Sequence, residues 1–580
     1  MPTKNHWRST NSGDAKANKK LYVSSTITIV GTGVVAVALL AYSAMSPVHA
    51  EVIGPLTPEE RALQAYNLRV EAADRNYIVT SDHPNNGDEA LEGYINSYTK
   101  GLPHNTDGVV DPIAYAALIH ALSTGDNADF EAIPATGCSA PYICNGQQKQ
   151  RNPQAAYSYL MEGGDPHSFS MPAAPAFTSA KQAAEAIEVL WQAITRDIPF
   201  TEYDTHPLIQ QAADDMSRFS DFDGPKDKIT DKVTPGTLFR GVGEGETRGP
   251  YISQFLLQPI PFGATTIEQL YNVPVEGNDH LTDYDEWLHI QTGGRPTGIT
   301  TVKYQNNPLY IHNGRAMAEY VLNDFINQAY LAAARIIRSY GSDVYDKNIN
   351  GEIFDPYAGS ATQTRSPLFG NNHVVDLLSR VSMSSQNVAW FQKWLVHRRA
   401  RPEVFFGRVH NHLTNPEINY LIHGELFDSP ALNIVYKRNG TYLLPTATPV
   451  GSPLHPTYPA GHAVMAGAAV TMLKAIFDEE YKLPITVIPS KNGKKLEDYV
   501  APEGEELTIE SELNKLASNI SLGRDIAGVH YRTDGDLGIV LGEQYAISVL
   551  KDLVNTYSED FEGFKIKKFD GTEEIIRKNH

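Results

Sequence analysis

The chain has 580 residues, which is too many for one ordinary core, so we expect two to four domain-sized units. Hydrophobic residues make up 41% of the chain and aromatic residues 9%, which excludes a largely disordered or collagen-like protein. The formal net charge of −20 argues against nucleic acids and anionic membranes as partners, and a content of two cysteines excludes a disulfide scaffold or a cysteine-ligated metal centre.

Residues 1–50 have the composition of a signal peptide. An apolar stretch over residues 26–45 is followed by small residues at positions 48 and 50, which suit cleavage before Glu51. This stretch approaches the length of a bilayer span, so an uncleaved N-terminal anchor is the alternative. Either way, we expect the rest of the chain to be exported to a periplasmic or extracellular space. The basic residues that precede the apolar stretch are Lys4, Arg8, Lys16, Lys19 and Lys20.

Both cysteines lie in one turn-rich loop. Cys138 and Cys144 are close in sequence, and an exported chain meets an oxidising compartment. We therefore expect a local disulfide between them, with two free thiols as the alternative. Their spacing is wider than that of a Cys-x-x-Cys redox pair.

Residues 51–341 form a predicted N-terminal helical region. Apolar residues recur at intervals of three and four over residues 179–198 and 316–340, which predicts an amphipathic helix in each segment. Ser179 and Gln182 suit a capping box, and Pro199 ends the first of these helices. Turn-dense connectors and little strand-like alternation favour a mostly helical protein with long loops.

Residues 342–580 form a predicted C-terminal helical region. The polar stretch 490–512 is expected to be a surface excursion without chemistry of its own. We therefore predict an all-α fold of paired helical bundles, with an oxyanion site at helix ends in the C-terminal half. The helices predicted in this region span residues 374–401, 463–478, 513–526 and 537–554.

Two further segments could bind metal ions. Residues 346–351 resemble the start of a calcium loop, although Tyr357 stands where such a loop has its last acidic ligand, and a plain turn is the alternative. His410, His412 and His423 could ligate zinc, but hydrogen-bonded histidines without a metal are the commoner arrangement.

The first of three segments with residues suited to catalysis contains Lys393, His397 and Arg401, which are spaced by four and are predicted to share one helix face. Pro402 marks the predicted end of that helix. Two cations on one face repel each other unless an anion or an acidic group lies between them. A solvated basic helix is the alternative, but the neighbouring Trp390 argues against full exposure.

The second segment runs from His455 to His462, where a turn rich in proline and glycine leads into a helix of small residues. The first N–H groups of a helix have no partner inside it and favour an anion. His462 stands at that point and could exchange protons with a bound oxyanion. The small residues that follow would let another helix pack closely. A tight structural turn is the alternative.

The third segment contains Arg524, His530 and Asp534. Arg524 is a permanent cation with a planar fork of donors. Asp534 follows His530 by four residues and could fix the tautomer of the imidazole, which leaves the other ring nitrogen as a nucleophile or metal ligand. Taken alone, the pattern is weak and fits a hydrogen-bonded structural histidine better.

Together, the three segments supply three cations, a helix N-terminus and two histidines. Lys393, Arg401 and Arg524 suit a tetrahedral or trigonal-bipyramidal oxyanion with a charge of about −2 or −3. An acidic exported protein does not need such a set in order to fold, because burying cations without an anion costs several kcal/mol each.

This combination of motifs resembles the vanadium-dependent haloperoxidases, and among them the algal-type bromoperoxidase branch. The resemblance implies a helical fold that is shared with acid phosphatases of the phosphatidic-acid-phosphatase type. Residues 248–257 and 455–458 also look like that branch, so the resemblance covers most of the exported chain. The motifs that carry it are Lys393 with Arg401-Pro402, the run Pro459-Ala460-Gly461-His462, and Arg524 with Gly528-Val529-His530-Tyr531-Arg532.

The resemblance implies a vanadate cofactor and a role for each site residue. His530 would be the axial ligand of vanadium, and His462 the acid–base group that helps hydrogen peroxide replace an oxygen. Lys393 would polarise the bound peroxide toward attack by a halide. His455 stands where this branch carries a second histidine, which favours bromide and iodide over chloride. The groups that would hold the vanadate oxygens are Lys393, Arg401, the Gly461 N–H, His462 and Arg524.

One residue departs from the family pattern, which usually reads Ser-Gly-His where this chain has Ala460 before Gly461 and His462. The serine hydroxyl would have given vanadate one hydrogen bond, worth about 1.5–3 kcal/mol when the acceptor is charged. We therefore expect either a lower vanadate affinity or a neighbouring group or water that fills the gap. Because the cations remain, we expect the activity to be retained.

The resemblance therefore predicts a homo-oligomeric enzyme that oxidises bromide or iodide with hydrogen peroxide to hypohalous acid, which halogenates small organic substrates. One alternative is a phosphohydrolase of the same fold, with His530 as nucleophile and His462 as acid. The other is a degenerate oxyanion-binding protein, of which Ala460 would be the first sign of decay.

Overall fold

The computed structural model describes residues 54–79, 81–297, 301–346 and 354–579. The predicted signal peptide or anchor, residues 1–50, lies outside the described residues. The contacts divide the chain into two units, Met1–Tyr66 and Asn67–His580, and helix α2, Pro58–Arg75, spans their boundary. The description below concerns the second unit.

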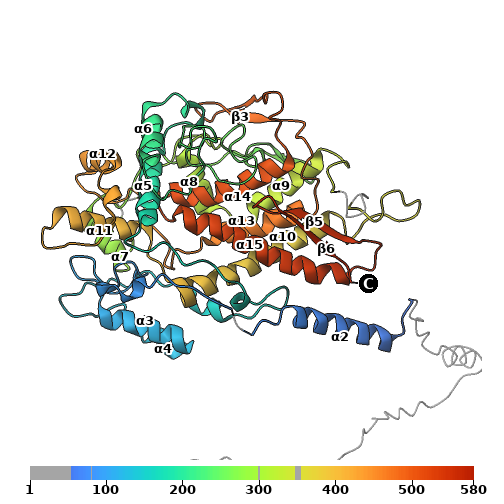
Figure 1. The fold of residues 1–580 in the computed structure, drawn as a ribbon, viewed down its shortest axis with the longest axis horizontal. Helices are drawn as coiled ribbons and strands as arrows, with labels where there is room; N and C mark the ends of the chain where they lie inside the picture. The colour runs from blue at the N-terminus through green and yellow to red at the C-terminus, as the bar shows by residue number, and fades with distance from the viewer. Residues whose placement is uncertain (1–53, 80, 298–300, 347–353, 580) are drawn as a thin grey trace, which may run out of the picture. The chain divides into compact units, whose positions relative to one another are not determined.

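Helices dominate the second unit (Figure 1), which confirms the predicted all-α class. In the described residues, the named strands form three two-stranded antiparallel hairpins, and no helix is long and apolar enough to cross a bilayer. The helices are α3 (Pro112–Thr124), α4 (Asn127–Glu131), α5 (Ala180–Thr195), α6 (Pro207–Met216), α7 (Tyr284–Gln291), α8 (Gly314–Asn323), α9 (Gln328–Ser339), α10 (Asn371–Phe391), α11 (Pro402–Thr414), α12 (Pro430–Asn439), α13 (Gly461–Lys474), α14 (Ile509–Ile526) and α15 (Arg532–Leu553). The hairpins are β1 (Ile260–Phe262) with β2 (Thr265–Ile267), β3 (Val487–Pro489) with β4 (Leu496–Asp498), and β5 (Gly563–Lys567) with β6 (Glu573–Arg577).

Helix α13 is the centre of the C-terminal half and packs against α10, α14 and α15 (Figure 1). Small residues allow this close packing, as the sequence predicted. An ideal Cβ on Gly467 would lie 2.0 Å from the carbonyl oxygen of Ile539 in α15, and one on Gly542 of α15 would lie 2.0 Å from the carbonyl oxygen of Val464 in α13. The two helices therefore contact each other through backbone atoms, which fixes the N-terminus of α13 against that of α15.

Helix α14 is buried along its whole length and begins earlier than the sequence predicted. It starts at Ile509, after a capping box in which Thr508 and Ser511 exchange hydrogen bonds. Lys515 is buried with Glu512 at 2.7 Å, so these two charged residues are paired with each other rather than solvated. The expectation that 490–512 is a surface excursion is wrong at its C-terminal end, because charge density alone does not reveal a buried ion pair.

The predicted helix over 316–340 is two helices. Helix α8 ends at Asn323, Asp324 adopts an extended conformation, and α9 begins at Gln328. The apolar spacing continues across this break, so periodicity gave no sign of it. The break places the Asp324 side chain at the site described below.

The predicted helix over 374–401 is also shorter than expected. Helix α10 continues as a π-helical turn over Gln392–His397 and stops at Arg398, whose φ of 44° lies in the left-handed region. Arg401 precedes a new helix, α11, in which Pro402 is the first residue. The proline begins a helix rather than ending one, since its missing N–H costs nothing at the first helical position.

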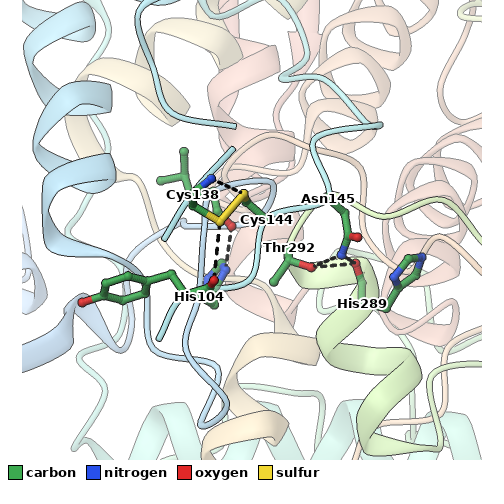
Figure 2. Close-up of a disulfide and its surroundings, with 8 residues drawn as sticks. His104, Cys138, Cys144, Asn145, His289 and Thr292 are labelled. Carbon is green, nitrogen blue, oxygen red and sulfur yellow. Dashed lines mark hydrogen bonds between the residues drawn. A yellow bond between two sulfur atoms is a disulfide. The ribbon is translucent and has the colours of Figure 1, made fainter. Parts of the chain in front are cut away.

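The disulfide between Cys138 and Cys144 is confirmed (Figure 2). Its loop is attached to the end of α7, because the Asn145 side chain donates to the hydroxyl of Thr292 at 2.6 Å (Figure 2). The same loop continues to Arg151, which lines the reaction cavity described below.

Other sequence expectations have mixed outcomes. Ser179 caps α5 by accepting from the Gln182 N–H, while the Gln182 side chain bonds Arg399 instead of completing the predicted box. His410 and His412 accept backbone hydrogen bonds, and the described residues contain no group of three or more His, Cys, Asp or Glu side chains placed to hold a metal ion. Residues 347–353 of the predicted calcium loop lie outside the described residues, so that site stays a prediction, as does the division into regions at residue 341.

Candidate vanadate site

A cavity of about 450 Å³ lies at the N-terminal end of α13. Five of the seven predicted site residues line it, and the other two, Lys393 and Arg401, are fully buried. Arg401 hydrogen-bonds His455 and His530, and Lys393 hydrogen-bonds the backbone of Pro456 and Thr457, which follow His455 in the chain. Segments that are far apart in sequence therefore meet at one place. The five lining residues are His455, Gly461, His462, Arg524 and His530.

His530 is held in one tautomer. Its Nδ1 lies 3.0 Å from an Asp534 carboxylate oxygen, and its Nε2 lies 2.8 Å from Nη1 of Arg401. Because the guanidinium can only donate, Nε2 must accept, so the proton is on Nδ1 and is donated to the carboxylate. Burial, followed by the charges of Arg401 and Lys393, holds the pKa of His530 well below its ordinary value. The ring is neutral and its Nε2 lone pair faces the cations.

Asp534 is itself fixed by three further donors. Arg399 donates to its Oδ1 at 2.9 Å, the Tyr531 N–H donates to its Oδ2 at 3.0 Å, and the Thr457 hydroxyl donates to the same oxygen. Arg399 also bonds the buried Glu185 at 3.0 Å. The sequence predicted the pairing of His530 with Asp534, but it did not predict the contacts of Arg399 or Thr457 with Asp534. The one sequence feature that pointed to these two residues is that they lie next to the motif segments.

Arg401 binds two of the histidines at once. In addition to His530, its Nη2 lies 3.0 Å from Nδ1 of His455, and its remaining donors reach the carbonyl oxygens of His455 and Val529. Burial, relieved in part by Asp534, lowers the pKa of Arg401 to about 10, so the group stays charged at neutral pH.

Lys393 is completely buried in the π-helical turn, and its Nζ donates to the carbonyl oxygens of Pro456 and Thr457, each at 2.7 Å. Burial, with the charge of Arg401 as the next cause, holds the pKa of Lys393 well below its ordinary value. Within the part of the chain that the structure describes, this fully buried ammonium has no carboxylate at ion-pair distance.

Arg524 is the third cation of the site. It is 6% exposed and lines the cavity, its Nη1 donates to the carbonyl oxygen of Val321 at 2.7 Å, and its Nε is buried without a hydrogen-bond partner. Burial lowers the pKa of Arg524 to about 10. None of the ion pairs found in the described part of the chain includes Lys393, Arg401 or Arg524.

His462 is paired with a carboxylate that the sequence analysis missed. Its Nε2 lies 3.1 Å from Oδ1 of Asp324, in the break between α8 and α9. The His462 side chain is 27% exposed, so it meets both the cavity and a largely buried acid. No spacing rule could have found Asp324, because it lies 138 residues away from its partner.

The N-terminus of α13 completes the site. Gly461 is its first residue and lines the cavity, where the first N–H groups of a helix lack partners inside it. Ala460 is the N-cap and supplies no side-chain hydrogen bond, so the hydroxyl expected from the family pattern is absent at a fully buried position.

His455 and Trp390 form a wall of the cavity. Their ring centroids are 4.8 Å apart, and both line it. Burial, with Lys393 and Arg401 as the next causes, holds the pKa of His455 well below its ordinary value. The wall therefore presents a neutral imidazole and an indole face beside the cations.

His397 does not belong to the site, contrary to the predicted shared helix face. The π-helical turn rotates it away from Lys393, and its ring packs edge-on against Tyr458 with centroids 4.6 Å apart. Burial lowers the pKa of His397 to about 3, so it is a neutral packing residue.

Comparison with known proteins gives a consistent assignment. A protein family described as the VCPO second helical-bundle domain matches residues 422–559. The vanadium-dependent bromoperoxidase of Ascophyllum nodosum is 33% identical to this chain over 542 residues, covering 90% of this chain and 93% of the relative. That of Corallina officinalis is 30% identical, covering 89% of this chain and 98% of the relative. The chain belongs to the vanadium-dependent bromoperoxidase family.

A solved structure of this family agrees with the fold. The homohexameric structure of the second vanadate-dependent bromoperoxidase from Ascophyllum nodosum superposes with a TM-score of 0.85 at 27% identity, covering 94% of this chain and 96% of that chain. As a bromoperoxidase-family protein, this chain spans nearly the full length of its relatives. The resemblance predicted from the three motifs is thus confirmed.

Proposed function

We propose that this protein is a vanadate-dependent bromoperoxidase, which oxidises bromide or iodide with hydrogen peroxide to hypohalous acid that halogenates small organic compounds. The observation that carries this proposal is the set of three buried cations, Lys393, Arg401 and Arg524, around the Nε2 lone pair of a neutral His530. Desolvated cations without carboxylate partners favour an oxyanion between them.

The residues present fit vanadate. The unpartnered Nε of Arg524, the ammonium of Lys393 and the guanidinium of Arg401 would donate to its oxygens, together with the Gly461 N–H. Nε2 of His530 would be the metal ligand, with its tautomer set by Asp534. Bound vanadate supplies a Lewis-acidic centre that activates hydrogen peroxide toward a halide.

The protein supplies proton transfer and orientation. His462 is placed to move a proton at the cavity, with Asp324 orienting its ring at 3.1 Å. Arg399 and Thr457 hold the Asp534 carboxylate in place beside His530 by hydrogen bonds. We further propose that Trp390 and His455 hold the halide against the cavity wall, where a polarisable bromide or iodide suits the aromatic surface.

We also propose that the enzyme is exported and homo-oligomeric. The Cys138–Cys144 disulfide supports export, because such bonds persist in oxidising compartments. The homohexameric relative supports assembly of several copies. The composition argues against nucleic acid as a partner.

The decisive experiment is bromination of monochlorodimedone by the purified protein with peroxide and bromide, with and without orthovanadate. We expect activity that depends on vanadate. Turnover of p-nitrophenyl phosphate without bromination would instead identify a phosphohydrolase, and neither activity would identify a degenerate binding protein. As a control, His530→Ala should lose both bromination and vanadium retained after gel filtration.

A further inference from the structure

A second cavity of about 340 Å³ adjoins the reaction cavity on the Asp324 side. Three residues at the end of α8 and in the loop before it, Tyr304, Glu319 and Asn323, line both cavities. Asp324 lines only the outer one and His462 only the inner one, although the two side chains are bonded to each other. The His462–Asp324 pair and the three shared residues therefore form the partition between the cavities.

Glu319 is the acid of this partition that lines both cavities. It is 8% exposed, and its Oε1 accepts hydrogen bonds from the Tyr304 hydroxyl at 2.7 Å and from the Asn323 amide at 2.8 Å. Asn323 is one helical turn further along α8, directly before Asp324. In the described residues, Glu319 has no cation at ion-pair distance, so nothing fixes it as a permanent carboxylate.

The proposed reaction needs a proton in every turnover. Bromide and hydrogen peroxide give hypobromous acid and water only when one proton is taken up: Br⁻ + H₂O₂ + H⁺ → HOBr + H₂O. Bromide loses two electrons to the peroxide oxygens, and the proton completes the water that leaves. A partly buried His462 must therefore be reprotonated once for each bromide oxidised.

We propose that Glu319 is a proton relay, which takes protons from water in the outer cavity and passes them into the reaction cavity, where His462 uses them. This inference rests on the proposed function. The carboxyl group of Glu319 lines both cavities. Its hydrogen-bond partner Tyr304 is 46% exposed and so connects the outer side of Glu319 to solvent. A buried hydroxyl without a partner, that of Tyr320, lines the outer cavity and offers a further site for water.

The charged surroundings suit a group that gains and loses a proton. On the outer side, the titratable groups are Tyr271, Tyr304, Tyr320 and Asp324. On the inner side, they are Arg151, His455, His462, Arg524 and His530. Burial raises the pKa of Glu319, with the Tyr304 hydrogen bond opposing the shift. The protonated form is thus populated closer to neutral pH than in an exposed glutamate.

The test is Glu319→Gln in the full-length, vanadate-loaded enzyme. Glutamine keeps the acceptor oxygen for Tyr304 and Asn323 but cannot carry the proton. We expect kcat for bromide to fall about tenfold or more near neutral pH, while KM for bromide stays within about twofold. The solvent deuterium isotope effect on kcat should rise, and small acids such as acetic acid should restore part of the rate through the open cavity.

A matched control is Glu268→Gln. Glu268 also accepts from a tyrosine hydroxyl, that of Tyr310 at 3.0 Å, but it lines neither cavity, so we expect wild-type kinetics. A readout independent of turnover is the infrared carboxyl band, since Glu319→Gln should remove one band that titrates above the range of exposed carboxyls. Vanadium retention should be unchanged in both variants.

Two outcomes would overturn the proposal. If Glu319→Gln has wild-type kcat, or if its kcat falls but small acids give no rescue and the isotope effect is unchanged, Glu319 relays no proton. The failure of the proposed function is distinguishable, because the wild-type enzyme would then brominate nothing. Tyr304→Phe is the second variant, and it should keep most of the activity because the carboxyl group remains.

Discussion

Ala460, which lacks the hydroxyl of the serine in the family pattern, is the residue that most directly changes how the site holds an oxyanion. Ala460 is fully buried at the N-cap of α13, beside the Gly461 N–H. Alanine is among the poorest N-cap residues, and it leaves an unmatched acceptor on any oxyanion bound there. The cations of Lys393, Arg401 and Arg524 must supply the affinity that this position does not.

Ala460→Ser should therefore tighten vanadate binding. A hydrogen bond to a charged acceptor is worth about 1.5–3 kcal/mol, so the Kd should fall about tenfold or more. The measurement is equilibrium dialysis of the apo protein against orthovanadate. An unchanged Kd would mean that another group, or an ordered water, already makes that contact.

His397 makes a second residue-scale prediction, because it is buried as a neutral ring. The pKa of His397 is lowered by burial to about 3 in the folded chain, below the ordinary histidine value of 6.5. Its contribution to stability is complete above pH 6.5 and is lost as the pH falls toward 3. The stability of His397→Gln should therefore depend less on pH in this range. Relative to the variant, the wild type should lose about 2 kcal/mol of unfolding free energy from pH 7 to pH 5.

The measurement for His397 is urea unfolding of both proteins across that pH range. The difference between the two proteins cancels the contributions of other titrating groups to the pH dependence of stability. One of these groups is Glu185, since burial raises its pKa to about 7. A gap that stays constant with pH would mean that burial does not lower the pKa of His397 in the folded protein.

At the residue scale, the sequence predicted what local spacing encodes. His530 with Asp534 lies at i and i+4, and His462 follows Gly461 at a helix start, so both arrangements followed from helix geometry. Asp324 and Arg399 did not, because their contacts join segments more than a hundred residues apart. Nothing in a single sequence measures such a distance.

At the scale of elements, the site depends on how closely α13 and α15 approach. Gly467→Ala would place a Cβ 2.0 Å from the carbonyl oxygen of Ile539, which is backbone and cannot rotate away. We expect the helices to separate, with a loss of about 1–3 kcal/mol in stability and weaker vanadate retention, because α13 carries His462 and α15 follows His530. Thermal melting and vanadium content measure the two effects.

The control for Gly467 is Gly424→Ala, since no atom lies within 4 Å of the Cβ position at Gly424. It should melt like the wild type and keep its vanadium. If Gly467→Ala does the same, the contact between α13 and α15 does not position the site.

Helix boundaries show where periodicity stops being informative. Spacing predicted the long helices, but the break at Asp324 and the π-helical turn over Gln392–His397 both lie inside continuous apolar patterns. Each is stabilised by tertiary contacts: the first by His462, the second by the carbonyl oxygens that Lys393 binds. These two irregular segments carry site residues, as expected where local preference and function conflict.

At the scale of the whole molecule, the chain is acidic while its central site is cationic. The family followed from the resemblance that three motifs carry when they are read together, and the helical fold class agreed with the apolar spacing along the chain. The boundaries of the bundles and the pairings between distant segments depend on packing, which composition and spacing do not determine.

The buried cations make the stability of the protein depend on its ligand. Orthovanadate at about 100 times its Kd should stabilise the folded protein by about 2.7 kcal/mol, which is measurable as a higher melting temperature.

Arg524→Met removes a buried charge that has one carbonyl partner and an unpartnered Nε. Without vanadate, this variant should melt no lower than the wild type, because the lost hydrogen bond is offset by the removed desolvation cost. With the same vanadate concentration, it should gain less than the wild type. Equal gains in both proteins would mean that Arg524 does not contact the oxyanion.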